Sequence, residues 1–301
     1  MTGVLLVANA EAGSAEDERV EAAGAVLAAA CDVEVARPEG ADALADAVAG
    51  AQGRVVVLAG GDGTVHLAVR ALLHRDPELL AATTLGLVPL GTGNDLANGL
   101  GIPDDPAEAA RVCLKGTARR LDLVVTDTDD VVVNASHAGL GAAAAARSAG
   151  MKDALGPLAY PLGALIAGVR EAAWDLTVTL DGVVIHSGRT LMVGIANGPS
   201  IGGGTRLVPP ALPDDGLLDV LVVTAVGPAA RLAFGAALRD EAHLDRDDVR
   251  HARGRCVTVA GDPVPHDLDG ELTDDLPTCT YTVRPGAWQM LVRSGAGTRG
   301  R

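Results

Sequence analysis

The chain has 301 residues, 48% of them hydrophobic, so it is long enough to bury one large core or two of ordinary size. Its 39 acidic residues outnumber its 24 basic ones, and the resulting charge of −15 argues against broad electrostatic binding to nucleic acid or to anionic lipid head groups. The four cysteines form no Cys-x-x-Cys pair, which argues against a zinc site and against a disulfide framework.

The first ten residues carry no basic cluster, and charged residues follow soon after, so the sequence predicts no signal peptide. The longest uncharged apolar run, residues 155–169, contains Pro157 and Pro161 and falls short of the roughly 20 residues needed to span a bilayer. We therefore expect a cytoplasmic protein whose contact with a membrane is peripheral and transient.

The first 120 residues alternate short aliphatic runs with helical patterns. Strands are predicted at residues 4–8, 33–36, 55–59 and 85–89. Ser14 can cap a helix that runs to about residue 30, Asp105 before Pro106 marks another helix start, and Gly116 marks its end. Strands and helices in alternation predict a doubly wound parallel sheet with both faces covered.

From about residue 121 the pattern becomes mostly β. Strand-like runs occupy residues 121–126, 131–134, 176–180, 183–186, 190–196, 217–224, 256–260 and 280–284, and Asp181-Gly182 suits a tight hairpin turn. Helices are predicted at 138–148, 155–173 and 228–239. The expected architecture is an N-terminal α/β domain, residues 1–122 joined by about 287–301, and a C-terminal β-sandwich domain, residues 123–286.

Three glycines and an aspartate follow the strand at 55–59, in the segment Gly60-Gly61-Asp62-Gly63-Thr64. Glycines let a backbone approach an anion closely, and a helix N-terminus, which Thr64 can cap here, adds favourable partial charge. The segment lacks the Gly-Lys-Ser/Thr ending of a Walker loop, so Asp62 would neutralise phosphate charge by holding magnesium, directly or through water. The alternative is an ordinary strand-to-helix turn.

A second glycine-rich turn, Gly91-Thr92-Gly93-Asn94-Asp95, follows the next predicted strand. Ligands of open parallel sheets bind outside the carboxyl ends of the strands, so we expect both turns to face one nucleotide. Taken alone, this turn could equally be a structural one in which Asn94 caps a helix.

These segments resemble the diacylglycerol kinase catalytic domain family, which includes bacterial lipid kinases and sphingosine kinases. The resemblance runs from Asn9 to about Leu291, with the motifs in the family's order. Its carriers are residues 60–64, Pro89 to Ala97, Asn197-Gly198 with Gly202-Gly203-Gly204, Asp214 to Asp219, and Asp269-Gly270-Glu271.

The resemblance implies an enzyme that uses ATP and Mg²⁺ to phosphorylate a lipid alcohol, most simply diacylglycerol. It implies Glu271 as general base with Asp62 as the second catalytic residue, and magnesium near Asp62, Asp95 and Asp215. The residues that it places at ATP are Asn9, Gly13, Gly60, Gly61, Asp62, Gly63, Thr64, Val65, Gly91, Thr92 and Asn94.

Other interpretations stay open on the residues alone. Asp269-Gly270 also suits a plain hairpin turn, with Glu271 a solvated residue beside it. The Gly-Gly-Asp-Gly-Thr turn also occurs in NAD kinases, although the residues at 91–97 and 269–271 speak against that assignment, and a non-catalytic nucleotide- or lipid-binding module would keep the same turns. The apolar segments 138–146 and 155–169 could line a lipid entrance or pack on the second domain.

The only partner that the sequence predicts is the lipid substrate. With one Phe, two Tyr and two Trp, the chain offers no stacking platform for nucleic acid, which is therefore not an expected partner. The seven histidines show no metal-ligand spacing. The oligomeric state, a homodimer included, is left open.

Overall fold

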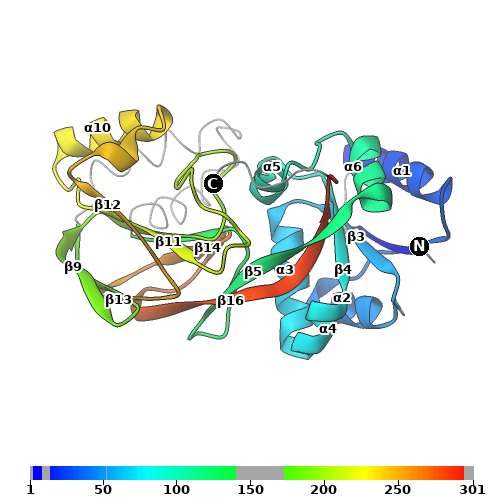
Figure 1. Cartoon of the computed structure of the whole chain (residues 1–301), viewed down its shortest axis with the longest axis horizontal. Helices are drawn as coiled ribbons and strands as arrows, with labels where there is room; N and C mark the ends of the chain where they lie inside the picture. The colour runs from blue at the N-terminus through cyan, green and yellow to red at the C-terminus, as the bar shows by residue number, and fades with distance from the viewer. Residues whose placement is uncertain (1–2, 9–13, 52, 140–172, 295–301) are drawn as a thin grey trace. The chain divides into compact units, whose positions relative to one another are not determined.

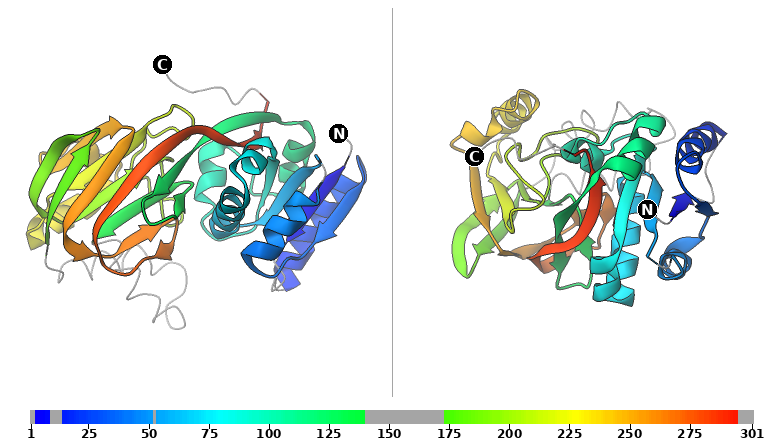
Figure 2. Two further views of the ribbon diagram at one scale, coloured as in Figure 1. Left: turned by 90° about the horizontal axis from the view of Figure 1, so that it is seen from below. Right: turned by 45° about the vertical axis from the view of Figure 1, so that its right-hand side comes forward.

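A computed structural model describes residues 3–8, 14–51, 53–139 and 173–294 of the chain (Figure 1). The chain divides into two compact units. Unit 1 consists of Met1–Asp122 and Gly286–Arg301, and unit 2 of Leu123–Pro285. Two strands, β5 (Thr117–Thr126) and the long curved β16 (Leu276–Val292; Figure 2), pass from one unit into the other.

Unit 1 is built on a parallel sheet in the order β2-β1-β3-β4, with the end of β16 pairing parallel to β4. Its central strands are buried along almost their whole length, as expected when helices cover both faces of a sheet. Gly86 in β4 leaves no room for a larger residue, because a Cβ there would lie 2.7 Å from the sulfur of Cys113. The strand bounds are β1 Val4–Ala8, β2 Val33–Ala36, β3 Val55–Gly60 and β4 Thr84–Pro89.

The helices of unit 1 fall into two groups. Helix α1 (Ser14–Ala28) packs with α6 (Pro106–Lys115), whereas α2 (Gly40–Ala49), α3 (Asp62–Arg75) and α4 (Pro77–Ala82) pack in sequence. The chain moves in one direction along the sheet from β1 to β2, and in the opposite direction from β2 to β3 and β4. Because such crossovers are right-handed, the two groups of helices lie on opposite faces of the sheet. The short helix α5 (Asp95–Leu100) follows β4.

Unit 2 is a sandwich of two antiparallel sheets. One sheet contains the first part of β16, then β13, β8 and β9, with β5 and β6 joined to β16; the other has the order β12-β11-β10-β7-β14-β15. Apolar residues of both sheets meet in one core, in which Tyr281 is fully buried. The strand bounds are β6 Val131–Val132, β7 Ala135–Gly139, β8 Trp174–Leu180, β9 Val183–Thr190, β10 Met192–Ala196, β11 Leu218–Val223, β12 Val249–Gly254, β13 Cys256–Val264, β14 His266–Leu268 and β15 Glu271–Leu272.

A second apolar cluster covers the outer face of the sheet that contains β10 and β11. Helix α10 (Pro228–Arg239) contributes Phe234, which is 4% exposed, and the loop before β11 contributes Leu207 and Val208. His243, in the short helix η2 (His243–Asp245), is also buried and lies edge-on to Phe234. This sheet therefore has apolar packing on both of its faces.

The predicted fold class is confirmed, since unit 1 is α/β and unit 2 is an antiparallel β-sandwich. The side chain of Asp105 caps α6 as predicted, by accepting a hydrogen bond from the N–H of Glu108 at 2.8 Å, and Gly116 ends that helix. Asp181 and Gly182 have φ of 48° and 81°, as the tight hairpin between β8 and β9 requires.

Some boundaries predicted from the sequence are wrong. The helix predicted at 138–148 begins on residues that belong to strand β7, because Ala138 pairs with Val193 in β10 and with His266 in β14. The run predicted as one strand at 190–196 is divided between β9 and β10. Residues 140–148, and the helix predicted at 155–173 apart from Ala173, lie outside the described residues.

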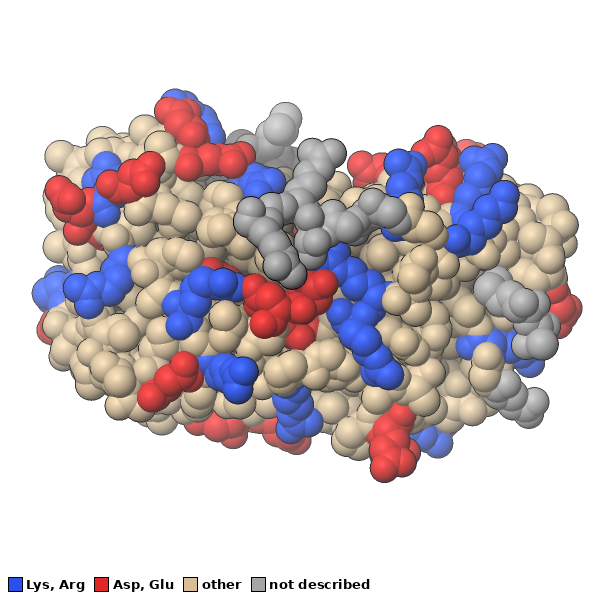
Figure 3. Space-filling view, viewed as in Figure 1, with Lys and Arg blue, Asp and Glu red and all other residues tan. Residues whose placement is uncertain are grey.

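Among the residues that the structure describes, no helix is both long and apolar enough to cross a membrane. Acidic and basic side chains are interspersed on the face shown in Figure 3.

Candidate active site

The first glycine-rich turn joins β3 directly to α3. Strand β3 ends at Gly60 and α3 begins at Asp62, so Gly61 is the N-cap residue and no side chain caps the helix. The prediction that Thr64 caps this helix is therefore wrong: Thr64 lies in the first turn, and its N–H donates to the carbonyl of Gly61 at 3.0 Å. A Cβ on Gly60 would lie 2.2 Å from Oγ1 of Thr64, so the turn closes only around a glycine.

The second turn lies beside the first because β3 and β4 are neighbouring parallel strands. The N–H of Leu90 donates to the carbonyl of Gly60 at 3.0 Å. A Cβ on Gly91 would come within 2.8 Å of the Cα of Gly61, and one on Gly61 within 3.0 Å of the Cα of Gly91. The two turns thus touch backbone to backbone, a closeness that any other residue type would prevent.

Asn94 shapes the second turn from within. It adopts the left-handed conformation, with φ of 50°, and its Nδ2 donates to the carbonyl of Gly91 at 2.8 Å. Asn94 is the N-cap residue of α5, as one of the two interpretations of this turn predicted, but its side chain makes no capping hydrogen bond.

The cap of α5 comes instead from the first turn. The carboxylate of Asp62 accepts the N–H of Asp95 at 2.9 Å and that of Leu96 at 3.0 Å, one on each oxygen. Asp62 therefore ties the two turns together, a role that its position in the sequence does not reveal. Asp95, at the start of α5, is 4% exposed.

Arg19 of α1 contacts the end of β4, directly before the second turn. Its Nη2 donates to the carbonyls of Pro89 at 2.8 Å and Asp104 at 3.0 Å. Nothing in the sequence around Arg19 signals this contact, because the two partners lie 70 and 85 residues away. A small cavity at the two glycine turns is lined by Glu16, Val20, Ala59, Gly60, Gly61, Thr64, Leu90 and Gly91.

Of the other residues predicted at this site, Val65 is fully buried in α3, whereas Gly63 and Thr92 are exposed. Asn9 and Gly13 lie outside the described residues. The remaining predicted residues, Asp215 and Glu271, belong to unit 2.

Glu271 begins β15, directly after the hairpin turn that joins β14 to β15. Asp269 and Gly270 have φ of 53° and 98°, as expected of such a turn, and Leu268 pairs with Glu271. Both residues of β15 are exposed, so the carboxylate of Glu271 is accessible to solvent. The turn itself is thus confirmed, and it leaves Glu271 available either as a base or as a solvated residue.

Asp269 anchors the base of this hairpin. Its carboxylate accepts the backbone N–H groups of Val133, Asn134 and Ala135 at 2.6, 2.9 and 2.9 Å. Three N–H donors on one carboxylate fix its position firmly. The turn that carries Glu271 is thereby tied to the segment entering β7.

Beneath the turn lies a buried pair that the sequence analysis missed. Asp267 in β14 is directly opposite His137 in β7, and the two are 4% and 7% exposed. The Oδ1 of Asp267 accepts the N–H of Gly270 at 2.7 Å, which braces the turn from below. Burial raises the pKa of Asp267 and lowers the pKa of His137, and each shift is opposed by their mutual attraction.

The preceding residue, His266, belongs to a second buried group. Its Nδ1 lies 2.6 Å from the hydroxyl of Tyr281, which lies 3.0 Å from the hydroxyl of Ser136. Burial, with a smaller contribution from His137, lowers the pKa of His266 from 6.5 to about 4. His266 is therefore neutral at neutral pH.

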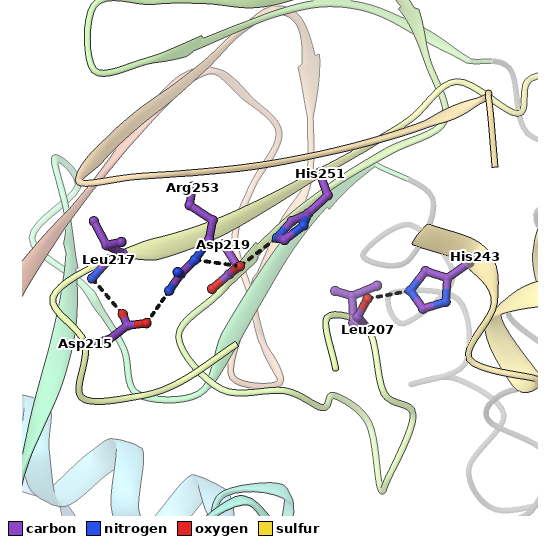
Figure 4. A network of polar contacts seen from close by, with 7 residues as sticks. All are labelled: Leu207, Asp215, Leu217, Asp219, His243, His251 and Arg253. Carbon is purple, nitrogen blue, oxygen red and sulfur yellow. Dashed lines mark hydrogen bonds and ion pairs between the residues drawn. The ribbon is translucent and has the colours of Figure 1, made fainter. Parts of the chain in front are cut away.

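Asp215 is ion-paired and hydrogen-bonded within unit 2. Its Oδ2 forms an ion pair with Nη2 of Arg253, and its Oδ1 accepts the N–H of Leu217 at 3.1 Å (Figure 4). Within the described ranges, no three His, Cys, Asp or Glu side chains are arranged to hold a metal ion.

The comparisons with known proteins agree with this two-part construction. Residues 3–126 match the model of the diacylglycerol kinase catalytic domain, and residues 134–292 match that of the YegS C-terminal NAD kinase beta sandwich-like domain. A protein of Stenotrophomonas maltophilia (strain K279a) named "Probable lipid kinase YegS-like" is 35% identical over 227 residues, which are 72% of each chain.

Two solved structures show the same fold. One, described as a diacylglycerol kinase from Bacillus anthracis str. Sterne, superposes with a TM-score of 0.75 at 22% identity and 98% coverage of both chains. The other, yeast NADH kinase complexed with NADH, gives a TM-score of 0.54 at 11% identity and covers 99% of this chain and 84% of its own.

The fold and its matches define a two-domain protein of the diacylglycerol-kinase-like class. Within that class, the chain belongs to the diacylglycerol kinase catalytic domain family, in its YegS-like branch.

Proposed function

We propose that the protein is a lipid kinase that transfers the γ-phosphate of ATP to a lipid hydroxyl, with diacylglycerol as the first acceptor to test. The observation that carries this proposal is the pair of glycine turns tied together by Asp62, found in a chain whose relatives are named lipid kinases. Phosphoryl transfer depends mainly on positioning and charge neutralisation, which such a rigid backbone frame can supply.

In this proposal the nucleotide phosphates bind at the first turn. The first backbone N–H groups of a helix point out of its N-terminus, and the N-terminus of the 14-residue helix α3 favours negative charge. Gly60 and Gly61 line the small cavity at this turn, and a glycine backbone lets phosphates approach closely. Gly91, Thr92 and the other proposed contacts of the second turn would border the same ligand.

Magnesium fits the two carboxylates of these turns. Mg²⁺ in phosphoryl-transfer sites is commonly held by one or two carboxylates together with substrate phosphates and water. The two oxygens of Asp62 accept the N–H groups of Asp95 and Leu96, so both carboxylates lie at the same turn of α5. Asp62 and Asp95 would hold the ion, which when bound neutralises the phosphate charge.

Glu271 is the proposed general base. A neutral alcohol loses its proton during transfer, and an exposed carboxylate on a braced hairpin can accept that proton. Asp267 and Asp269 hold the turn by hydrogen bonds to backbone N–H groups, so Glu271 is the carboxylate of this hairpin left accessible to a substrate.

The test is phosphate transfer from labelled Mg-ATP to diacylglycerol, a sphingoid base, a polyprenol and NAD, the lipids being presented in mixed micelles. We expect a labelled lipid, with diacylglycerol labelled fastest. NAD is included because the yeast NADH kinase shares the fold; labelling of NAD alone would contradict the proposal. ATP binding without any labelled acceptor would favour a non-catalytic module instead.

A further inference from the structure

In unit 2, the loop before β11 and the neighbouring strand β12 form a polar network (Figure 4). Strands β11 and β12 pair antiparallel, with Asp219 directly opposite Arg253 and Leu221 opposite His251. Arg253 and His251, two residues apart on β12, therefore point to the same face of the sheet. Asp215, in the loop that leads into β11, lies on the other side of the Arg253 guanidinium.

One guanidinium joins two carboxylates in this network. Nη2 of Arg253 forms an ion pair with Oδ2 of Asp215, and its Nε lies 3.2 Å from Oδ1 of Asp219. The same oxygen of Asp219 lies 2.6 Å from Nε2 of His251. Asp219 is 1% exposed, so its charge is deeply buried and depends on these partners.

The electrostatics agree with a permanent cation at this place. Burial alone would lower the pKa of Arg253, but Asp219 and Asp215 together raise it above its ordinary value. Arginine stays charged under all physiological conditions, and its planar fork suits two carboxylates better than the point charge of a lysine does.

Asp215 as it stands does not fit a magnesium ion. The resemblance to the kinase family implies a metal here, and Mg²⁺ requires nearly octahedral oxygen ligands. Both oxygens of Asp215 are already used, one by the N–H of Leu217 and one by Arg253. A guanidinium between Asp215 and Asp219 also places a positive charge where a divalent cation would have to bind.

We propose that Arg253 is the built-in cation of this loop and that it takes the place of a structural magnesium ion. The side chain neutralises Asp219 and fastens Asp215, and with it the turn at Gly216, to strand β12. The geometry of unit 2 is then independent of divalent cations. This inference stands apart from the proposed kinase activity, because none of its residues belongs to the glycine turns or to the 266–272 hairpin.

A direct test uses amide NMR of the full-length protein, without nucleotide, titrated with Mn²⁺ in molar excess. Bound Mn²⁺ broadens the signals of nearby amides, and the Leu217 amide reports on Asp215 because it is hydrogen-bonded to that side chain. We expect the Leu217 and Arg253 signals to keep their intensity. Selective broadening of these signals that disappears in Asp215→Asn would overturn the proposal, even if Mn²⁺ also binds elsewhere.

Thermal unfolding supplies the second test. In EDTA, Arg253→Met should lower Tm by about 3 to 8 °C, because the two carboxylates lose their cation. MgCl₂ should restore part of that loss of Tm in Arg253→Met, but not in the double variant Arg253→Met/Asp215→Asn. The Tm of Arg253→Lys should lie between those of Arg253→Met and wild type. An Arg253→Met protein with wild-type Tm, or one indifferent to Mg²⁺, contradicts the proposal. If Arg253→Met does not fold, the NMR titration of the wild-type chain still decides.

Discussion

In unit 1 the glycine turns are held largely by the backbone, whereas in unit 2 the hairpin that carries Glu271 is held by buried side chains. Gly61 and Gly91 pack Cα against Cα, and the carboxylate of Asp62 binds backbone N–H groups of the second turn. Beneath the hairpin, Asp267 and His137 face each other across two strands. The stability of the first region should therefore depend mainly on added volume, and the stability of the second on changes of charge and pH.

The largest effect is expected for Asp62→Asn. The amide keeps one oxygen for the N–H groups of α5 but loses the charge proposed to hold magnesium, so kcat should fall by roughly 10⁴. Transfer assays and circular dichroism would measure activity and folding separately. Asp105→Asn is the control, because the carboxylate of Asp105 also caps a helix, α6, without belonging to the turns. Undiminished transfer by the Asp62 variant would remove this residue from the mechanism.

Glu271→Gln tests the chemical role of the hairpin. Loss of a general base should lower kcat by about 10² to 10⁴, while Tm stays unchanged because the side chain is exposed. The control is Asp274→Asn, another exposed carboxylate only three residues away. Equal kinetics for Glu271→Gln and Asp274→Asn would show that Glu271 is only a solvated residue beside a turn.

Gly91→Ala tests the backbone contact in unit 1. The new Cβ would lie 2.8 Å from the Cα of Gly61, and because both atoms belong to backbone or are fixed to it, the turns must separate. We expect a loss of about 2 kcal/mol in stability together with weaker ATP binding, measured by urea unfolding and by calorimetry. Gly227→Ala is the control, since no atom lies within 4 Å of its Cβ position and it belongs to no proposed site. Similar behaviour of the two variants would argue against a functional contact between the turns.

The last prediction concerns the pH dependence of the stability of unit 2, where no effect on the chemical step is expected. The folded pKa of His266 is about 4 and the ordinary value is 6.5, so the unfolded chain binds this proton more readily. The contribution of neutral His266 to the free energy of unfolding is therefore complete above pH 6.5. It is lost as the pH falls to 4, and the loss reaches up to about 3 kcal/mol.

His266→Asn should flatten this part of the stability profile, because asparagine can bind the Tyr281 hydroxyl without titrating in this range. Urea unfolding at several pH values between 4 and 7 measures the difference from wild type. His74→Asn, at an exposed position in α3, should leave the profile unchanged. A wild-type slope in His266→Asn would show that other groups cause the acid sensitivity.

The sequence predicted the two-part fold because hydrophobic periodicity and turn residues are local signals. Neighbouring residues determine the alternation of strands and helices up to about residue 120. The same holds for the hairpin at Asp181-Gly182 and for the cap at Asp105. The boundary error at residues 138–139 has a different origin. Its alanine-rich sequence favours a helix, but pairing with β10 and β14 decides in favour of a strand.

The sequence by itself also determined which glycines and carboxylates are present at the two turns and at the 269–271 hairpin. Only the tertiary structure decided their partners: Asp62 caps a helix that begins 33 residues later, Arg19 reaches Pro89, and Arg253 binds Asp215. His137 and Asp267 meet because β7 and β14 pair across 130 residues of chain. Short motifs record which chemical groups are available, whereas strand order and register determine which of those groups come within hydrogen-bonding distance.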